Sequence, residues 1–279
     1  LHVNRFVSGS IDLDDIHVTA ETDTRNYNIG INAGGNDLKA QLNGLIQMGD
    51  AINVVLSDLL LDYKGYDWHQ ASDTAFISIA DTEYEVRNLH LVRDSIDFTE
   101  SIYADGVIRR AGEQDLRLDI NNFNLGRLMQ VLNPDQNVNG TANLNLQVAG
   151  SAESPILTGA LNMDSTTVQN FSFDTIRSNI NFRDYELGVN LNIVPQDSGR
   201  ITGEGRLPMV VRLDSMQFGV VPQKTDPLYL RLLISSLPLS IVNIFLPTDE
   251  IAGEINSFVN LDGTVGQPDI SGNLRVDNG

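Results

Sequence analysis

The residues best suited to chemistry lie near the start of the chain, where three carboxylates and an imidazole fall close together. They are Asp12, Asp14, Asp15 and His17. Carboxylate and imidazole groups bind divalent metals, so this grouping suggests a metal site at first sight. Apolar residues alternate with them, however, which predicts a strand or a strand end, and no calcium-binding loop with its Gly and closing Glu follows. We therefore expect a solvated acidic edge and no metal ion.

Other motifs that carry chemistry are missing from the sequence. His90 lies between Leu89 and Leu91, which predicts that it points to the wet face of a strand. The sequence has no Gly-x-Ser-x-Gly nucleophile elbow, no phosphate-binding loop and no dinucleotide fingerprint. We also expect no Asp or Glu to interrupt an apolar face, where burial would raise its pKa. Carboxylate pairs of the glycosidase type stay open in so acidic a chain, but we expect no enzyme and no cofactor.

The composition limits the partners of this chain. Its 279 residues include 37 acidic and 18 basic side chains, and the formal charge of −19 argues against binding nucleic acid. The chain has no Cys, so disulfides, thiolate metal sites and thiol nucleophiles are excluded. No apolar run reaches the ~18 residues of a membrane span. The chain begins at Leu1 without a Met, and we expect it to be a fragment of a longer protein.

Alternation of apolar and polar residues is the dominant pattern, and it predicts β-strands with one dry and one wet face. Breaks such as 33–37, 183–185 and 197–199 predict hairpin turns between antiparallel neighbours. The number of such strands is roughly eighteen to twenty, far above the usual share. We therefore predict an all-β fold with a long, curved, mostly antiparallel sheet. The clearest runs are Ile29–Ile31, Ile52–Leu56, Leu89–Leu91, Leu116–Ile120, Leu144–Val148, Ile180–Phe182 and Leu187–Ile193.

Two short segments have helical spacing instead. Apolar residues at i, i+3, i+4 and i+7 predict a helix over about 124–133, which Pro134 ends. The same spacing, with Ser236 as N-cap, predicts a second helix over about 238–246, which Pro247 ends. We expect both helices to lie on the dry face of the sheet. Their apolar positions are Leu125, Leu128, Met129 and Leu132 in the first helix, and Ile241, Val242 and Phe245 in the second.

The helices belong to an internal repeat. The segment Pro134–Asp164, with its Gly-x4-Pro-x3-Gly core, recurs as Pro247–Asp277, and Leu116–Ile120 upstream matches Leu230–Ile234. Repeats of this kind predict an elongated array in which each unit packs on its neighbours. We divide the chain into a β segment over 1–115, a repeat unit over 116–229 and an incomplete second unit over 230–279.

A sheet with one apolar face must hide that face. A packed sandwich or a β-helix would do so, and both stay open as alternatives. We favour a trough with the apolar face inside, shielding lipid acyl chains, because aliphatic residues dominate and aromatic residues make up 6% of the chain. A carbohydrate-binding β-solenoid would instead display aromatic platforms. The predicted lipid-groove lining comprises Ile52, Val54, Leu56, Leu89, Leu91, Leu144, Leu146, Val148, Leu161, Ile180, Phe182, Leu187, Val189, Leu191, Ile193, Val259, Leu261, Ile270 and Leu274.

Three motifs of the sequence can be compared with known families. The first is Leu59-x-Leu61 followed by Gly65–Trp68, and the second is Leu116–Ile120 running into 124–128. The third is the pair of strings 138–159 and 251–272, each with a Gly-x4-Pro-x3-Gly core. Their order and spacing resemble the TamB family of the translocation and assembly module, which belongs to the AsmA-like bridge-like lipid-transfer proteins. The resemblance covers about residues 50–279.

The resemblance implies several properties that the residues alone do not predict. Proteins of this family carry an inner-membrane anchor, absent here, and span the periplasm of diderm bacteria with a long β-taco sheet. Their implied partners are phospholipid and an outer-membrane barrel protein of the Omp85 type. The implied function is a conduit whose apolar groove shields acyl chains between the two membranes. The alternative is a scaffold or chaperone for the assembly and secretion of outer-membrane β-barrel proteins.

Overall fold

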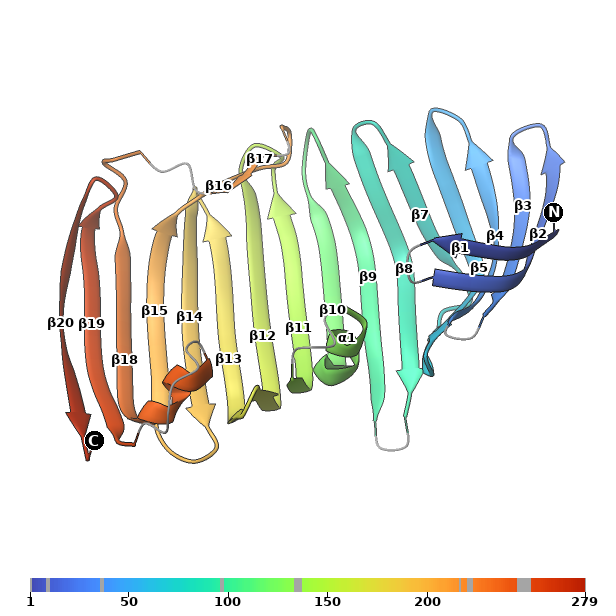
Figure 1. Cartoon of the computed structure of the whole chain (residues 1–279). Coiled ribbons are helices and arrows are strands. Elements are labelled where there is room, and N and C mark those ends of the chain that lie inside the picture. Colours follow the sequence, from blue (N-terminus) through green and yellow to red (C-terminus); the bar gives the residue numbers. More distant parts are fainter. Residues whose placement is uncertain are drawn as a thin grey trace. The chain divides into compact units, whose positions relative to one another are not determined.

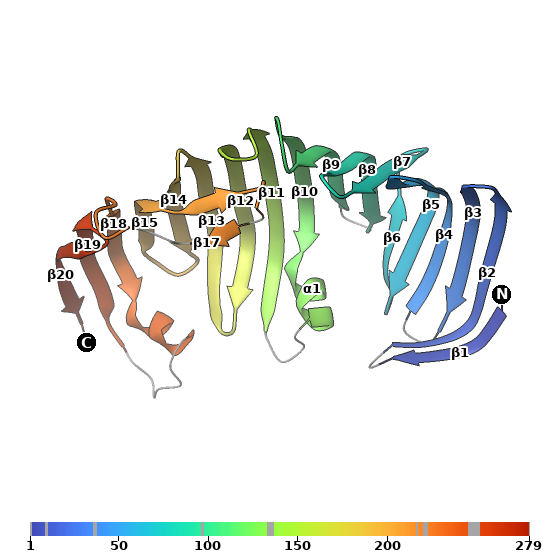
Figure 2. The ribbon, with the colours of Figure 1, turned by 90° about the horizontal axis from the view of Figure 1, so that it is seen from above.

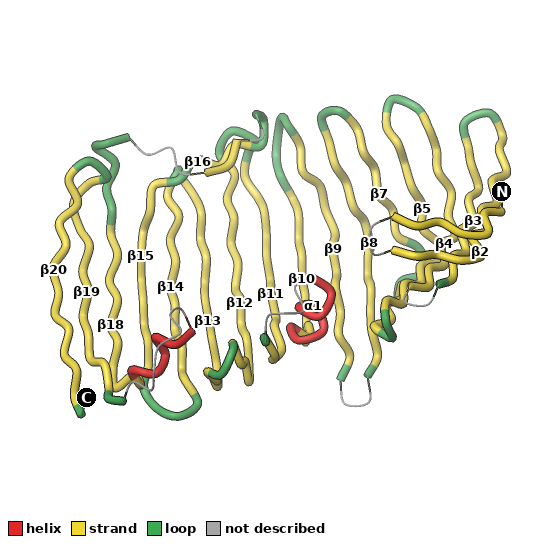
Figure 3. Tube along the Cα trace, in the orientation of Figure 1, coloured by secondary structure: helices red, strands yellow, loops and turns green. Residues whose placement is uncertain are grey.

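The computed structural model describes residues 2–8, 11–35, 38–95, 98–132, 137–215, 217–219, 223–244 and 252–278. Within these residues the chain forms twenty strands, one α-helix and one 3-10 helix (Figures 1 and 3). It divides into two compact units, 1–122 and 123–279. The all-β class that the alternation predicts is confirmed.

The elements follow one another as hairpins along most of the chain. The first ten strands are β1 (His2–Ser8), β2 (Ile11–Asp23), β3 (Asn26–Gly34), β4 (Leu38–Met48), β5 (Ala51–Tyr63), β6 (Tyr66–Gln70), β7 (Ala75–Ala80), β8 (Glu83–Asp94), β9 (Thr99–Arg109) and β10 (Asp115–Asn124). They are followed by α1 (Leu125–Leu132), β11 (Val138–Gly150), β12 (Pro155–Val168), β13 (Phe171–Arg183), β14 (Glu186–Pro195), β15 (Arg200–Pro208), β16 (Val210–Arg212), β17 (Gln217–Gly219), β18 (Tyr229–Pro238), η1 (Leu239–Ile244), β19 (Glu254–Thr264) and β20 (Gln267–Asp277).

In the first unit each strand pairs antiparallel with its neighbours in sequence, with one exception at β6 and β7. The long strand β5 pairs with β7 along its first half, where Ile52 faces Ile79, and with β6 along its second half, where Tyr63 faces Tyr66. Strand β8 pairs with both in the same way. The short strands β6 and β7 therefore share one position in the sheet.

In the second unit the order is also sequential, except for an inserted hairpin. Strands β11 to β15 each pair with the next, and β15 then pairs directly with β18, followed by β19 and β20. Strands β16 and β17 pair with each other and form a two-stranded sheet. They cross the ends of β12 and β13, on the same side of this unit's sheet as α1, which packs against β11 (Figures 1 and 2).

The strand register converts the alternation of the second unit into two continuous faces, because residues paired across strands point to the same side. Four rows of paired residues cross β11 to β14 on the face that we call the apolar face. The Phe182 row is Val148, Leu157, Phe182 and Leu187, and the Ile180 row is Leu146, Gly159, Ile180 and Val189. The Leu191 row is Leu144, Leu161, Ser178 and Leu191, and the Ile193 row is Ala142, Met163, Ile176 and Ile193.

The first unit has an apolar face of its own, which continues through shifts of the strand register such as the β-bulge in β8. Between Val86 and Leu89 the register against β9 shifts by one residue, and Asn88 in the bulge has a φ of 53°. The amide of Asn88 donates to Asp105 Oδ2 at 2.8 Å, which holds the bulge in place. Because the extra residue is absorbed there, Val86 and Leu89 face the same side although they are three positions apart.

One of the two predicted helices is present as an α-helix and the other is not. Helix α1 confirms the first, and its N-cap is Asn124, whose Oδ1 accepts a hydrogen bond of 2.9 Å from the Arg127 amide. The second prediction is wrong, because η1 is a 3-10 helix and Ser236 lies within β18 rather than at a helix N-cap. The amide of Leu239 donates to the Gly253 carbonyl, and β-branched residues weaken helix propensity over this short segment. Phe245 and Pro247 lie outside the described residues.

The two copies of the sequence repeat share backbone details. Gly150 and Gly263 both have positive φ, 76° and 93°, and each faces the proline of its motif across a hairpin, Pro155 and Pro268 respectively. Because a positive φ is unfavourable for residues with a Cβ atom, the turn requires glycine in both copies. The division of the chain at 115 and 229 stays a prediction.

We expect Gly263→Ala to lower the free energy of unfolding by about 1–3 kcal/mol, the usual cost of a strained backbone conformation. An added Cβ atom there would also lie 2.5 Å from the Gln267 carbonyl oxygen. Urea unfolding measures the loss. Gly49→Ala is the control, because Gly49 has no positive φ and its nearest neighbouring atom would be 3.9 Å away. An equal loss in both variants would contradict this account of the turn.

Candidate functional site: the apolar faces of the two units

The predicted lining residues of the second unit all lie on its apolar face. The register from β11 to β14 places the predicted residues of these four strands on that face. Pairing through β15 and β18 continues the same face to β19 and β20. They are Leu144, Leu146, Val148, Leu161, Ile180, Phe182, Leu187, Val189, Leu191, Ile193, Val259, Leu261, Ile270 and Leu274. Their role as a lipid lining stays a prediction.

The predicted residues of the first unit also share one face. Ile52, Val54 and Leu56 lie in successive rows of β5, and Leu89 and Leu91 face Ala104 and Ile102 across β9. One row of this face is strongly exposed. Its members pair directly across four strands, and each is between 40% and 50% exposed: Met48, Ile52, Ile79 and Tyr84. Four large apolar side chains side by side on an exposed surface form a patch of the kind that binds a partner.

Glycines shape the apolar face of the second unit. Gly203 and Gly205 of β15 face Leu191 and Val189 of β14. A Cβ atom on Gly205 would lie 3.2 Å from the Leu230 side chain. The missing side chains on β15 therefore leave room that leucines from β18 enter, so the face stays apolar across a strand that contributes little of its own.

A charged cluster interrupts the apolar face of the first unit. Glu100 of β9 is 0% exposed and pairs with Arg93 of β8. Arg93 lies two positions after Leu91 on the same strand, so both members of the pair point to the apolar face. Its Oε1 accepts a hydrogen bond of 2.6 Å from Arg93 Nη1, and its Oε2 accepts one of 2.6 Å from the Tyr66 hydroxyl of β6. The Arg93 guanidinium lies 4.7 Å from the centre of the Tyr66 ring, and Trp68 contacts that ring edge-on.

This cluster corrects the expectation that no carboxylate interrupts an apolar face. Glu100 does so, and the burial is tolerated because a guanidinium and a phenol share its two oxygens. The cluster fastens the short strand β6 to β8 and β9, where backbone pairing between β6 and β8 covers only two residue pairs, His69 with Val92 and Gln70 with Leu91. Its chemistry is structural rather than catalytic.

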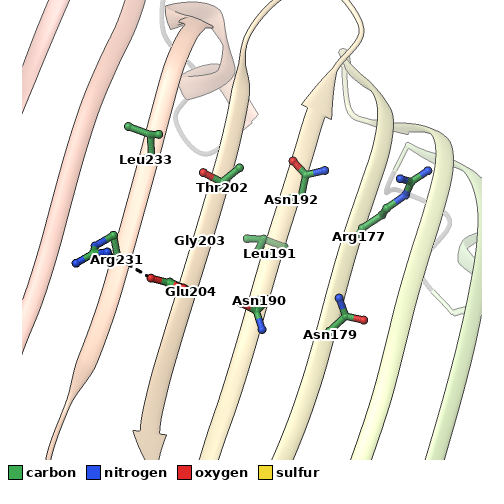
Figure 4. A pocket seen from close by; sticks show the side chains of 10 residues that line it. All are labelled: Arg177, Asn179, Asn190, Leu191, Asn192, Thr202, Gly203, Glu204, Arg231 and Leu233. Atoms are coloured by element: carbon green, nitrogen blue, oxygen red, sulfur yellow. Dashed lines mark ion pairs between the residues drawn. The ribbon is translucent and has the colours of Figure 1, made fainter.

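The polar face of the second unit carries a shallow hollow of about 480 Å³ over β13, β14, β15 and β18 (Figure 4). Its side chains belong to the alternation opposite the predicted lining, and the hollow reaches the apolar residue Leu191 only between strands. The lining is Arg177, Asn179, Asn190, Leu191, Asn192, Thr202, Gly203, Glu204, Arg231 and Leu233. Amide, hydroxyl and charged groups line this hollow together with Leu233, an apolar side chain of the polar face that is 48% exposed.

Electrostatics on this polar face centre on Glu204. Its Oε1 accepts a hydrogen bond of 2.5 Å from the Tyr229 hydroxyl and lies 3.6 Å from Arg231 Nη1. The hydrogen bond to the carboxylate raises the pKa of Tyr229 above its usual value, because it holds the phenol in its protonated form. The phenol therefore stays a hydrogen-bond donor rather than a base.

The first candidates for chemistry, in the acidic segment Asp12–His17, receive no support as a site. The side chains of Asp12, Asp14 and Asp15 lie outside the described residues. Across the parts of the chain that the structure describes, no group of three or more His, Asp or Glu side chains could hold a metal ion. His90 faces Tyr103 in the alternation opposite Leu89 and Leu91, and this confirms the prediction that it lies on the polar face.

Sequence reasoning missed several members of the first unit's apolar face. Met48, Ile79 and Tyr84 belong to its most exposed row, yet only Ile52 of that row was predicted. Alternation around Ile77 and Ile79 was a usable signal. Nothing local, by contrast, indicates that Tyr66 meets Glu100, because the two lie on different hairpins.

Sheets with one polar face and one partly exposed apolar face define a class of all-β proteins that offer an extended surface to a ligand or partner. Residues 1–276 match the family described as TamB, N-terminal domain, and the chain belongs to this family. The match confirms the resemblance seen in the motifs and extends it to the first 49 residues. Neither the curated proteins nor the solved structures contain a match to the chain.

Membership of this family gives the functional context. The TamB family is a structural and transport family and not a family of enzymes. Membership implies a role in the translocation and assembly module, a complex with an Omp85-type partner in the bacterial cell envelope. Among the helices of the described residues, none is long and apolar enough to cross a membrane.

We expect Glu100→Gln to lower the free energy of unfolding of the first unit by about 3–5 kcal/mol, because it leaves the buried Arg93 charge with only the exposed and more distant Asp67 carboxylate, 3.8 Å from Arg93 Nε, as counterion. Chemical denaturation followed by circular dichroism measures the change. Glu83→Gln is the matched control, since Glu83 Oε2 also lies 2.6 Å from an arginine, Arg109, but both side chains are more than a third exposed. That variant should lose less than about 1 kcal/mol. Similar losses in both would show that burial does not decide the effect.

Proposed function

We propose that the apolar faces of this chain shield phospholipid acyl chains as they cross the periplasm between the inner and outer membranes. The observation that carries the proposal is the exposed row Met48, Ile52, Ile79 and Tyr84, which pairs directly across four strands. A patch of this kind on a water-facing surface favours aggregation unless it has a ligand. The context of the bacterial envelope supplies a suitable one.

Energetics favour an acyl chain as that ligand. Burial of each methylene group is favourable by roughly 0.8 kcal/mol of free energy, so moving a sixteen-carbon chain from a membrane into water costs more than about 12 kcal/mol. An aliphatic face removes most of that barrier by contact alone, without directional chemistry. The lining residue Leu146 is only partly exposed, yet it continues the row of the more exposed Ile180, and Leu144 and Leu161 lie side by side in the next row.

The polar faces support the same function by staying in water. Asn190 and Asn192 alternate with Val189 and Leu191 along β14, so one strand has amides on its polar face, where Asn190 is exposed, and aliphatic groups on the face for the ligand. This separation keeps a sheet with an open apolar face soluble. Headgroups of the lipids remain in water on the open side of the face.

Photocrosslinking in the native compartment tests cargo and face together. A photoreactive residue in place of Leu146 should give phospholipid adducts, because that position faces the apolar side. The same residue at the neighbouring position Asn145, on the polar face, is the control and should give none. Mass spectrometry identifies the adducts. Peptide adducts at position 146 would instead support the scaffold for β-barrel assembly, and the absence of adducts at either position would contradict transport.

A charge in the middle of the face should block the passage of lipid. We expect Leu191→Asp to lower the rate of phospholipid transfer at least tenfold, since seating an acyl chain against a carboxylate costs more than about 1.4 kcal/mol. Asn190→Asp is the matched control, as it adds the same charge to the adjacent, exposed position on the polar face. Transfer between donor and acceptor vesicles is measured for both. Normal transfer by a folded Leu191→Asp protein would count against the proposal.

A further inference from the structure

The chain between β15 and β18 is longer than its topology requires. The two strands pair directly, with Arg206 opposite Tyr229, so a tight turn would suffice to join them. Strands β13 and β14 are joined in that way by Asp184 and Tyr185, both with positive φ. Between β15 and β18 the chain instead makes an excursion that contains the β16–β17 hairpin. Connections of this length usually have a function.

The hairpin covers one margin of the second unit's apolar face. It crosses the ends of β12 and β13 (Figures 1 and 2), and the Leu213 amide donates a hydrogen bond of 2.8 Å to the Ala152 carbonyl. On the hairpin, Val211 and Leu213 are buried and Val210 is half-buried. In the sheet beneath, Phe182 is 2% exposed, whereas Ile180 in the next row is 38% exposed. On β13 the cover therefore ends between Phe182 and Ile180, and Leu157 and Leu187, which belong to the Phe182 row, are half-buried.

The outer side of the hairpin is suited to water. Arg212 lies between Val211 and Leu213 in sequence, and its Nη2 donates a hydrogen bond of 2.5 Å to Asp214 Oδ2. Hydrogen bonding from Arg212, with further bonds from Ser215, lowers the pKa of Asp214 to about 2, so this ion pair keeps its charge in mild acid. The hairpin thus has an apolar underside and a charged outer side.

The opposite margin of the face is covered near β11 as well. Helix α1 packs against β11, and Ala142 in the Ile193 row is buried. At the other end of the same strand, on the hairpin's side, Val148 in the Phe182 row is buried as well. Between them, Leu144 and Leu146 stay partly exposed. On β11 this leaves two of the four rows open, and neighbouring rows lie roughly 7 Å apart along a strand. A strip of that width accommodates one acyl chain across it.

We propose that the β16–β17 hairpin is a side wall that confines lipid to the Ile180 and Leu191 rows, so that acyl chains lie in line along the strip and not side by side. This inference rests on the proposed function, and it adds a structural element that limits how many acyl chains fit side by side. The hairpin acts by occupying the Phe182 row itself, so no movement is required. Val211 and Leu213 are positioning residues, because they hold the wall on the sheet.

The test uses a phospholipid with a diazirine in its acyl chain, which inserts into any side chain that it touches on illumination. The unaltered chain is loaded from vesicles of this lipid and phosphatidylethanolamine, illuminated, and mapped by peptide mass spectrometry. We expect adducts on Leu146, Ile180 and Val189, and at least tenfold fewer on Val148 and Phe182. Because no residue is changed, the result does not depend on the folding of a variant.

Variants then examine the wall itself. Val211→Asp combined with Leu213→Asp should release the hairpin and raise the adducts on Phe182 to the level of Ile180. Arg212→Ser combined with Asp214→Ser changes the outer side only and should leave the map unaltered. Amide hydrogen exchange of β13 verifies that the sheet persists in both.

The outcomes separate the two proposals. Equal adducts on Phe182 and Ile180 in the unaltered chain would overturn the side wall while supporting lipid binding. A map that stays unchanged in a folded Val211→Asp, Leu213→Asp protein would also overturn it. If no peptide from any row of the apolar face carried a lipid adduct, the proposed function would be overturned, and this inference with it.

Discussion

The structure depends on a strand register that keeps the apolar residues of every strand on the same face as those of its neighbours. A slip of a single residue at any hairpin would turn every later apolar side chain to the opposite face. Direct cross-strand pairs such as Leu144 with Leu161 and Ile180 with Val189 keep the apolar residues on one face in the second unit. Where one strand has an extra residue relative to its partner, a β-bulge absorbs that residue and keeps the following side chains on the same face, as at Asn88. Register thus produces the faces on which any function of this chain rests.

An exposed apolar face must be stabilised by something other than a second sheet on top of it. In the first unit the buried Tyr66, Arg93 and Glu100 cluster fastens a short strand whose backbone pairing is sparse. In the second unit the covered margins, marked by Phe182 and Ala142, provide packing that the central rows lack. Backbone ladders and these local anchors together replace a conventional core.

Much of this arrangement could be predicted from the sequence, and the failures have physical reasons. Alternation predicted the strands, and it predicted which residues share a face wherever no bulge intervenes, as along Leu187 to Ile193. Val86 and Leu89 share a face despite odd spacing, which alternation cannot reveal. The charged cluster and the β16–β17 hairpin depend on contacts between distant segments. The second helix failed because β18 extends through Pro238 and only a 3-10 segment follows.

Stability and ligand binding compete for the same side chains on such a face, and the structure divides them between rows. A row packed under a hairpin contributes apolar burial to folding but has no surface left for a ligand, as at Phe182. A row left open, as at Ile180, contributes less to folding and keeps its surface for a ligand. Because Phe182 and Ile180 differ so sharply in exposure, the boundary between covered and open surface on β13 lies where the hairpin ends. The inserted hairpin therefore adds stability at the margin, and the same contact limits the width of the surface that remains.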